Sequence, residues 1–310
     1  MVRKIIIDTD PGQDDAVALL LALASPDELE VLGITSVAGN VPLELTTRNA
    51  LMLAELAGRT DVPVYAGCER PTVRPLITAE YVHGVSGIDG ADLPDPTTVP
   101  ADGHAVDFLI ETVMGSEVTT LCTLGPLTNI AVALEREPAI VSQVDELVLM
   151  GGGFFEGGNT TPAAEFNILV DPEAAAAVFT SGIPLVMMPL DVTHKALTSR
   201  AHVEAFRELG NAAGASVAGM LEFMERFDME RYGIDGGPLH DPCVIAYLLE
   251  PELFSGRDCY VAIETESELT MGMTVVDWWR LTDNEPNCLV MNQIDNEGFF
   301  RLLTERIGRL

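Results

Sequence analysis

The feature that most constrains this chain is an apolar run that ends in a cluster of carboxylates near the N-terminus. Three isoleucines follow Lys4, and four aspartates then fall within eight residues around a Pro-Gly pair. The aspartates are Asp8, Asp10, Asp14 and Asp15. Residues 16–24 are all Ala, Val or Leu and predict a helix. A strand, a turn and a helix in this order form the βα unit of an open parallel sheet, in which ligands bind at strand ends.

These four acids favour a bound cation. Like charges crowded at one strand end repel one another unless a positive charge shares the site. Carboxylate oxygens suit a hard cation such as Ca²⁺ or Mg²⁺. The alternative is helix capping, since Asp is favoured in the first turn of a helix. Capping accounts for one or two of the aspartates and leaves the others unexplained.

Length and composition predict a folded chain, although length alone leaves one large domain and two smaller ones both open. The chain has 310 residues and 47% hydrophobic residues, which is ample for a core. Strands and helices alternate along the whole chain, and no linker or repeat divides it. We therefore predict an α/β fold in one domain over residues 1–310. Its sheet is expected to be open, mostly parallel and Rossmann-like, with helices on both faces.

The charge balance excludes some partners. The net charge is −31, which argues against nucleic acid and against anionic membrane surfaces. The chain has only two lysines but fifteen arginines, a pattern that suggests a protein kept hydrated at high salt. Five scattered cysteines without a CxxC pair predict reduced thiols and a cytoplasmic location. We expect no signal peptide, because the first strand begins almost at once, and no span of roughly 20 apolar residues.

Further strands and helices follow from the hydrophobic pattern. Strands are expected at 29–36, 63–66, 118–124, 146–150, 183–188, 259–263 and 273–276. Helices are expected at 43–56, 105–114, 127–135, 199–227 and 297–307, and one more begins near residue 172. A further helix is expected to end at 249, with Asp241 as its N-cap and Pro242 as its first residue. The segment 67–103 has no clear periodicity, and a loop of this length inside a compact domain is usually functional.

Polar residues fall repeatedly at the predicted strand ends. Asn40 follows the second strand, and Asp191 and Asp241 follow later strands or begin helices. Parallel strands bring such positions to one edge of the sheet, so acids more than 220 residues apart can share a metal. The main-chain carbonyl of Leu124, at another strand end, is a further candidate oxygen ligand.

Six motifs along the chain resemble those of the nucleoside hydrolases, in particular the inosine-uridine-preferring group. They are DTDPGQDDA at 8–16, HGVSG at 83–87, LGPLTN at 124–129, MGG at 150–152, EFN at 165–167 with DPE at 171–173, and HDP at 240–242. The resemblance implies hydrolysis of the N-glycosidic bond of ribonucleosides to free base and ribose. It also implies one Ca²⁺ per subunit and a homodimer or homotetramer.

The same resemblance implies roles for individual residues. Ca²⁺ ligands would be the carboxylates of Asp10, Asp15 and Asp241 and the carbonyl of Leu124, where the family often has Thr or Val. Asp10 would also take a proton from the metal-held water. The substrate-binding residues would be Asp14 and Asn40 at the ribose hydroxyls, Asn159, Glu165 and Asn167 at the 5′ side, Met150 near the sugar, and His83 in a loop able to close over the base. His240 would face the base as leaving-group acid.

The reaction requires these residue types. Breaking the N-glycosidic bond builds positive charge on the ribose, as in glycoside hydrolysis, and carboxylate and amide oxygens stabilise that charge. The departing base needs a proton, and histidine titrates near neutral pH. His194 is more often structural in such a position, and Asp8 has no firm role beyond supporting the loop from behind.

Two other functions stay open. Asp8-x-Asp10 after a strand also resembles the nucleophile motif of Mg²⁺-dependent haloacid-dehalogenase-type phosphatases, which need a well-placed lysine; only Lys4 and Lys195 are present. A non-catalytic nucleoside- or calcium-binding protein on the same scaffold is the second alternative. Base preference depends on loops 68–103 and 222–237, whose sequence leaves purine and pyrimidine equally open.

Overall fold

The computed structural model describes residues 2–115, 119–232 and 236–310 of the chain. An eight-stranded sheet runs through it in the order β3-β2-β1-β4-β5-β6-β10-β7. Every neighbouring pair is parallel except β10 and β7, so the expected mostly parallel open sheet is confirmed. The strands are β1 (Arg3–Thr9), β2 (Leu29–Ser36), β3 (Val64–Ala66), β4 (Thr119–Thr123), β5 (Val144–Met150), β6 (Leu185–Met188), β7 (Phe254–Cys259) and β10 (Cys288–Ile294). A separate antiparallel pair joins β8 (Val261–Ile263) to β9 (Thr274–Val276).

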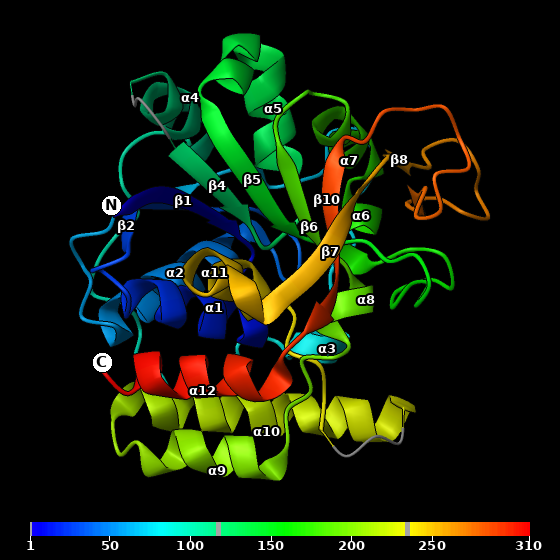
Figure 1. Cartoon of the computed structure of the whole chain (residues 1–310). Helices are drawn as coiled ribbons and strands as arrows, with labels where there is room; N and C mark the ends of the chain where they lie inside the picture. The colour runs from blue at the N-terminus through cyan, green and yellow to red at the C-terminus, as the bar shows by residue number, and fades with distance from the viewer. Residues whose placement is uncertain (1, 116–118, 233–235) are drawn as a thin grey trace.

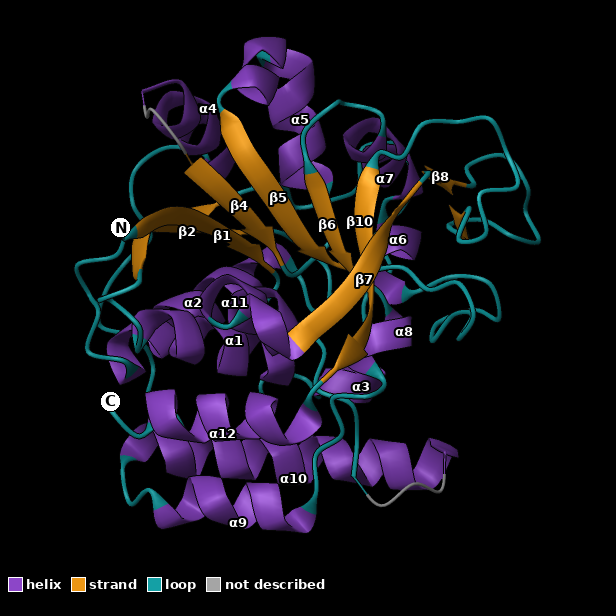
Figure 2. Cartoon of the chain, in the orientation of Figure 1, coloured by secondary structure: helices purple, strands orange, loops and turns teal. Residues whose placement is uncertain are grey.

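Helices cover both faces of the sheet, as Figures 1 and 2 show. One face carries α1 (Gln13–Leu23), α2 (Leu43–Leu56) and α11 (Pro242–Leu249), and the other carries α4 (Ala105–Gly115), α5 (Thr128–Arg136) and α7 (Pro172–Phe179). A further layer of α9 (Arg200–Glu208), α10 (Ala212–Tyr232) and α12 (Asn296–Ile307) lies outside α1. The short helices are α3 (Glu80–His83), α6 (Phe166–Val170) and α8 (Leu190–Thr193), with 3-10 turns at Pro138–Ser142 and Pro251–Leu253.

The central strand β1 shows how the sequence positions the sheet. Side chains alternate between the two faces of a strand. Ile5 and Ile7 therefore pack into the core on the α1 side, and Ile6 packs into the second core on the α4 and α5 side. All eleven residues of α1 are buried, because this helix lies between the sheet and the outer helical layer. An apolar run without a polar face is what such a position requires.

Most predicted elements in the first two thirds of the chain are confirmed, and the bounds of β2 and α2 agree with the prediction at both ends. The predicted strand at 118–124 begins at Thr119, with residue 118 outside the described part. The predicted helix at 199–227 is two helices, α9 and α10, and the segment 222–232 belongs to α10 instead of a loop. The end of the predicted loop 222–237 includes residues outside the described part.

The C-terminal third contains the errors. The predicted strand at 259–263 is confirmed only from Val261, where β8 begins, because Cys259 ends β7 in a different sheet. Strand β10, which extends the main sheet, was not predicted. Only the ends of β7 are buried, since it is the edge strand, and its sequence FSGRDC has too few apolar residues to indicate a strand. The exposed edge strand β7 therefore gave little hydrophobic signal, whereas β10 was missed although it lies inside the sheet.

Two simpler expectations are met in the described residues. None of their helices is both long and apolar enough to cross a membrane. The five cysteines are free thiols, and four of them are buried.

Candidate active site

A cavity opens at the carboxyl ends of the parallel strands, where the predicted site residues converge. It encloses about 840 Å³ of empty space, solvent at its mouth included. All but two of the predicted residues line it: Asp14, Asn40, His83, Leu124, Met150, Asn159, Glu165, Asn167, His240 and Asp241. The other two, Asp10 and Asp15, have no exposed surface and are not part of the lining. Segments more than 200 residues apart therefore meet at one sheet edge, as parallel topology requires.

The floor contains three carboxylates that can share an ion. One oxygen from each of Asp14, Asp15 and Asp241 lies within 4.8 Å of the others. Asp15 is fixed by the start of α1, because the backbone N–H of Gly12 donates to its Oδ2 at 2.9 Å and the Thr9 hydroxyl donates to its Oδ1. Asp241 occupies the predicted N-cap position of α11 but makes no side-chain capping hydrogen bond. Its carboxylate is therefore directed to the acid cluster and not to the helix.

Asp10 lies beside this cluster with one oxygen left without a partner. The backbone N–H of Asn40 donates to Asp10 Oδ2 at 2.7 Å, whereas Oδ1 is buried and accepts no hydrogen bond from the described residues. A side chain at Gly39 or Gly125 would collide with the carboxylate of Asp10, so both positions need glycine for close approach. A buried carboxylate oxygen without a donor is costly unless a cation satisfies it.

Burial and mutual repulsion disfavour the charged form of these acids. Burial raises the pKa of Asp10 well above its usual value, and the neighbouring charge of Asp15 raises it further. Burial raises the pKa of Asp15 and that of Asp241, and for both the next cause is the charge of Asp14. A hard cation would reverse these shifts, because it favours the ionised carboxylates. The donor set, carboxylates without thiols or imidazoles, fits Ca²⁺ or Mg²⁺.

A second group of side chains organises the cavity wall around α6. Glu165 is the N-cap of α6: it accepts from the backbone N–H of Asn167 at 2.9 Å, and it also accepts from Gly152 N–H at 2.9 Å. Burial raises the pKa of Glu165 to about 7. The amide nitrogen of Asn167 donates to the carbonyl of Leu124 at 2.6 Å and to the carbonyl of Met150 at 3.2 Å. The predicted carbonyl ligand is thus already tied to a predicted sugar-binding residue.

Asn159 and Asn40 also make contacts that shape the site. Asn159 Oδ1 accepts from the backbone N–H of Phe166 at 3.0 Å, which joins the loop to the start of α6. The side-chain amide of Asn40 donates to the backbone carbonyl of Asp10 at 3.1 Å and to Asp15 Oδ2 at 3.2 Å. Asn40 therefore holds the floor acids in addition to lining the cavity.

His240 reaches the cavity from the residue before Asp241. Its Nδ1 lies 2.7 Å from the hydroxyl of Thr193, at the end of α8. Burial lowers the pKa of His240 to about 3, with smaller effects from His194 and His83. This pKa is lower than the near-neutral value expected of a histidine, and it favours a neutral ring at pH 7.

His194 is a cavity residue that the sequence interpretation set aside as structural. It lines the same cavity, its ring centroid is 5.8 Å from that of His240, and its Nδ1 lies 3.2 Å from Glu156 Oε2. Asp191, two residues before Thr193, accepts from the backbone N–H groups of Phe154 and two following residues. The run Asp-Val-Thr-His after a strand was the available signal. It did not show that α8 packs against β10 and β6 (Figure 1), which places His194 in the cavity lining.

His83 is fixed in the cavity by Gln13, a residue inside the first motif whose role was not predicted. His83 Nδ1 lies 2.6 Å from Gln13 Oε1, and the Gln13 amide donates to the carbonyl of His83 at 2.9 Å. The same amide donates to the carbonyl of Asp89 at 3.1 Å. His83 ends α3, and its side chain is buried. The loop of His83 is thus joined to the first turn of α1.

Asp8 lies behind the floor and outside the cavity lining. Its Oδ2 accepts from the Thr35 hydroxyl at 2.7 Å and from the Asn129 amide at 2.8 Å. Burial raises its pKa to about 7. These contacts agree with a supporting position behind the loop.

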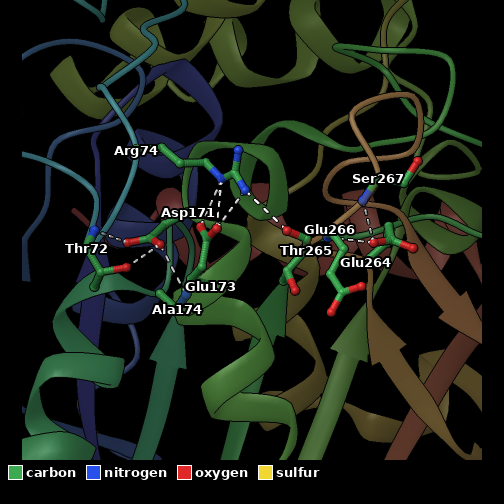
Figure 3. A network of polar contacts seen from close by, with 9 residues as sticks. All are labelled: Thr72, Arg74, Asp171, Glu173, Ala174, Glu264, Thr265, Glu266 and Ser267. Atoms are coloured by element: carbon green, nitrogen blue, oxygen red, sulfur yellow. Dashed lines mark hydrogen bonds and ion pairs between the residues drawn. The ribbon is translucent and has the colours of Figure 1, made fainter.

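The loop that leads to α3 is fastened by a network of polar contacts among residues that do not line the cavity, as Figure 3 shows. The backbone N–H and hydroxyl of Thr72 both donate to Asp171, each at 2.8 Å. The Arg74 guanidinium forms a bidentate ion pair with Glu173, its shortest contact 2.7 Å, and also donates to the carbonyl of Thr265 at 3.3 Å. The long segment 67–103 is therefore anchored, at least at this end, to α7 and to the segment between β8 and β9.

Neither lysine can serve a phosphatase site in the described cavity. Lys4 is exposed at the start of β1, and the exposed Lys195 donates to the carbonyl of Asn292. The described lining residues include no lysine. The cationic residue that the phosphatase alternative requires is missing from this lining.

Comparison with known proteins gives consistent results. The profile of the inosine-uridine preferring nucleoside hydrolase family matches residues 5–301. The pyrimidine-specific ribonucleoside hydrolase RihA of Salmonella typhimurium is 50% identical over 309 residues, covering 99% of both chains, and an uncharacterised Schizosaccharomyces pombe protein is 53% identical at the same coverage. A purine-preferring ribonucleoside hydrolase from Gardnerella vaginalis has a similar structure, with a TM-score of 0.92 at 34% identity over 99% of this chain and 98% of the other. A plant nucleoside hydrolase gives a TM-score of 0.90 at 34% identity, covering 99% of both chains.

Proposed function

This chain belongs to the inosine-uridine preferring nucleoside hydrolase family and is an enzyme of the ribonucleoside hydrolase type, and we propose that its cavity cleaves the N-glycosidic bond with one bound Ca²⁺ per subunit. The observation that carries the proposal is the floor of the cavity. Three carboxylates lie within 4.8 Å of one another there, and Asp10 beside them has a buried oxygen without a hydrogen-bond donor. Hydrolysis would yield free base and ribose.

The carboxylates of Asp10, Asp15 and Asp241 and the carbonyl of Leu124 would hold the ion. The three carboxylates that lie nearest one another include Asp14 and not Asp10. The part of the proposed ligand set to test is therefore which of these two aspartates binds the ion and which binds the sugar. Bound Ca²⁺ would supply positive charge for orienting the ribose hydroxyls and for making a water more acidic.

The remaining floor and wall residues would bind and polarise the sugar. Asp14 and Asn40 would accept or donate hydrogen bonds at the ribose hydroxyls, with Met150 packed beside the ring. Asn159, Glu165 and Asn167 would bind the 5′ side. Fixed carboxylates beneath the sugar stabilise the positive charge that develops as the bond breaks. Asp10, ionised in the loaded site, would accept the proton of the attacking water.

His240 would act on the leaving base. A neutral imidazole can donate a hydrogen bond to a group that becomes negatively charged, which makes the charge easier to form. With Nδ1 held by Thr193, the second ring nitrogen is the one left for the base.

The test is ribose release by the purified protein after treatment with EDTA. We expect release of ribose and base from uridine or inosine only after Ca²⁺ is added back. An equal rate in the metal-free protein would contradict the proposed metal role. Release of phosphate from phosphate esters would instead support the phosphatase alternative, and tight nucleoside binding without turnover would support a binding protein.

For the base, we propose a preference for pyrimidine ribonucleosides. The support is the 50% identity to the pyrimidine-specific enzyme over 99% of both chains, against 34% to the purine-preferring one. A panel of kcat/KM values for uridine, cytidine, inosine and adenosine tests the preference. A higher value for either purine nucleoside would overturn it.

The remaining expectations concern assembly, location and salt. We propose that residues 1–310 act as one domain, within a cytoplasmic homodimer or homotetramer. The net charge of −31 with two lysines supports adaptation to high salt, since added ions screen self-repulsion. Thermal unfolding in dilute buffer and in molar KCl tests this, and equal Tm values would contradict it.

A further inference from the structure

Two histidines in the cavity have one ring nitrogen fixed by a buried neighbour. Nδ1 of His83 contacts Gln13, and Nδ1 of His240 contacts Thr193. Both neighbours have no exposed surface. The Nε2 atom of each ring has no hydrogen-bond partner among the described residues, although both rings line the cavity. What each Nε2 offers to a ligand, a proton or a lone pair, depends on the tautomer of its ring.

The tautomer of His83 follows from the amide of Gln13. The amide nitrogen of Gln13 faces two backbone carbonyls, those of His83 and Asp89, at 2.9 and 3.1 Å. Only an amide N–H group can satisfy two acceptors, so the oxygen of Gln13 must face the ring. That oxygen accepts, and Nδ1 of His83 therefore carries the proton. Nε2 of the neutral His83 ring is then a bare acceptor.

The tautomer of His240 follows from the hydroxyl of Thr193. If Nδ1 of His240 carried the proton, it would donate to the hydroxyl oxygen, and the hydroxyl proton would need another acceptor. The described residues offer Thr193 Oγ1 no contact other than His240. A buried O–H without an acceptor costs about 1–3 kcal/mol. The hydroxyl therefore donates to Nδ1, and Nε2 of the neutral His240 ring carries the proton.

We propose that Gln13 and Thr193 are positioning residues that hold the two histidines in opposite neutral tautomers, so that His240 presents an N–H donor and His83 presents a lone pair to the base. This inference rests on the proposed function and deepens it. The ligand class it selects is a nucleobase with a hydrogen-bond acceptor for His240 and an N–H donor for His83. The imide of uracil and the lactam of hypoxanthine both offer such a pair.

The most direct test is ¹⁵N NMR of the protein labelled at its five histidines, without substrate. Two-bond ¹⁵N–¹H correlations distinguish the tautomers, and the His83→Ala and His240→Ala variants assign the signals. We expect the proton on Nδ1 of His83 and on Nε2 of His240. The same tautomer on both rings would overturn the proposal.

A pair of Thr193 variants tests the positioning role in catalysis. Thr193→Val keeps the shape and loses the hydroxyl, so we expect kcat for uridine to fall roughly tenfold or more, by analogy with a lost hydrogen bond. Hydrolysis of a riboside with a 4-nitrophenolate leaving group, which needs no donor, should change much less. Thr193→Ser should restore the rate for uridine. Thr128→Val is the matched control, because it removes another buried threonine hydroxyl, which donates to Asp171 at 2.8 Å away from the histidines.

Methylated substrates test the acceptor on His83. 3-Methyluridine lacks the N–H donor, whereas 5-methyluridine carries its methyl group elsewhere and keeps the donor. We expect the wild type to disfavour 3-methyluridine relative to 5-methyluridine by roughly tenfold or more, and Gln13→Met to lose most of that discrimination. Unchanged discrimination in Gln13→Met would contradict the assignment. A protein that hydrolyses no riboside would refute the proposed function instead, and the NMR result would still decide the tautomers.

Discussion

The floor of the cavity and the side that we propose faces the base, called the base side below, are built in different ways. The floor is made mostly by one short segment, Gly12–Asp15, with Asp10 and Asp241 beside it, and its carboxylates are fully or nearly fully buried. The base side is made of single residues from α3, the C-cap of α8, α10 and the segment before α11, among them His83, His194, Met224 and His240. The floor therefore comes mostly from one local segment, with Asp241 added from a distant one, whereas the base side depends on how several distant elements pack.

This difference suggests a division of labour. Buried acids around a ribose stabilise the charge that every substrate develops, whatever its base. Residues contributed singly by loops and helix ends can change without disturbing the floor, and function is commonly varied in such segments. We therefore expect changes in the floor to affect all substrates alike and changes on the base side to depend on the leaving group.

The largest effect is expected for Asp10→Ala. Loss of both an ion ligand and the acceptor of the water proton should lower kcat/KM for uridine and inosine by about 10³-fold or more. The fold should survive, because the wild-type carboxylate is itself unfavourably buried; circular dichroism checks this. Asp8→Asn is the matched control behind the floor, and we expect a loss below about tenfold. Near wild-type turnover in Asp10→Ala would contradict the assignment of the floor.

A smaller but still large effect is expected for His240→Ala. Removing a donor to the leaving group should lower kcat for natural nucleosides by about 10²-fold, within the range for acid-base residues. Initial rates of base release measure it. His202→Ala provides a control, because His202 stacks on Phe300 and does not line the described cavity. A rate within a few-fold of wild type for His240→Ala would remove this residue from the mechanism.

The stability of the metal-free protein should fall as the pH rises. The pKa values of Asp8 and Glu165 are raised to about 7 by burial, above ordinary values near 4. Between pH 4 and 7 the unfolded chain loses these protons while the folded chain keeps them, so folding becomes less favourable across this window. Ca²⁺ at about 100 times its Kd should restore about 2.7 kcal/mol. One fixed Ca²⁺ concentration should restore more at pH 8 than at pH 5, because protons compete with the ion for the carboxylates. Calorimetry measures both effects; a Tm independent of Ca²⁺ would argue against a metal-binding floor.

The smallest effect is expected at the anchor of the His83 loop. Arg74→Met removes the bidentate contact with Glu173 and the bond to the carbonyl of Thr265 (Figure 3). Since α3 and its histidine lie further along the same loop, we expect KM for uridine to rise a few-fold with kcat little changed. Steady-state kinetics check this, with Arg136→Met as the control because its ion pair with Asp107 is exposed and remote. A large fall in kcat would show that the anchor does more than position the loop.

The floor could be predicted from the sequence because all of its acids except Asp241 are neighbours in one motif. Spacing placed Asp10, Asp14 and Asp15 at the end of the first strand, and parallel topology brought Asp241 to the same edge. Sequence could not show which oxygens come together, and the compact group contains Asp14 where Asp10 was expected. That choice is made by side-chain rotamers and by the donors around each carboxylate.

The base side and the sheet edge could be predicted less well. Thr193 and His194 carry no motif that marks them as cavity residues, because only the packing of α8 brings them beside His240. The pKa of His240 is also a tertiary property, since burial sets it. Strand β7 is exposed along most of its length, so its sequence needs few apolar residues and gives little signal.

One crossed experiment tests the central claim directly: kcat/KM for uridine and for a 4-nitrophenyl riboside, measured in Asp10→Ala and in His240→Ala. If the floor acts on the ribose and His240 on the base, Asp10→Ala lowers kcat/KM for both substrates by a similar factor. His240→Ala then lowers kcat/KM for uridine by about 10²-fold, whereas kcat/KM for the nitrophenyl riboside stays within a few-fold of the wild-type value. Equal losses on both substrates in His240→Ala, or retained activity in Asp10→Ala, would contradict the account.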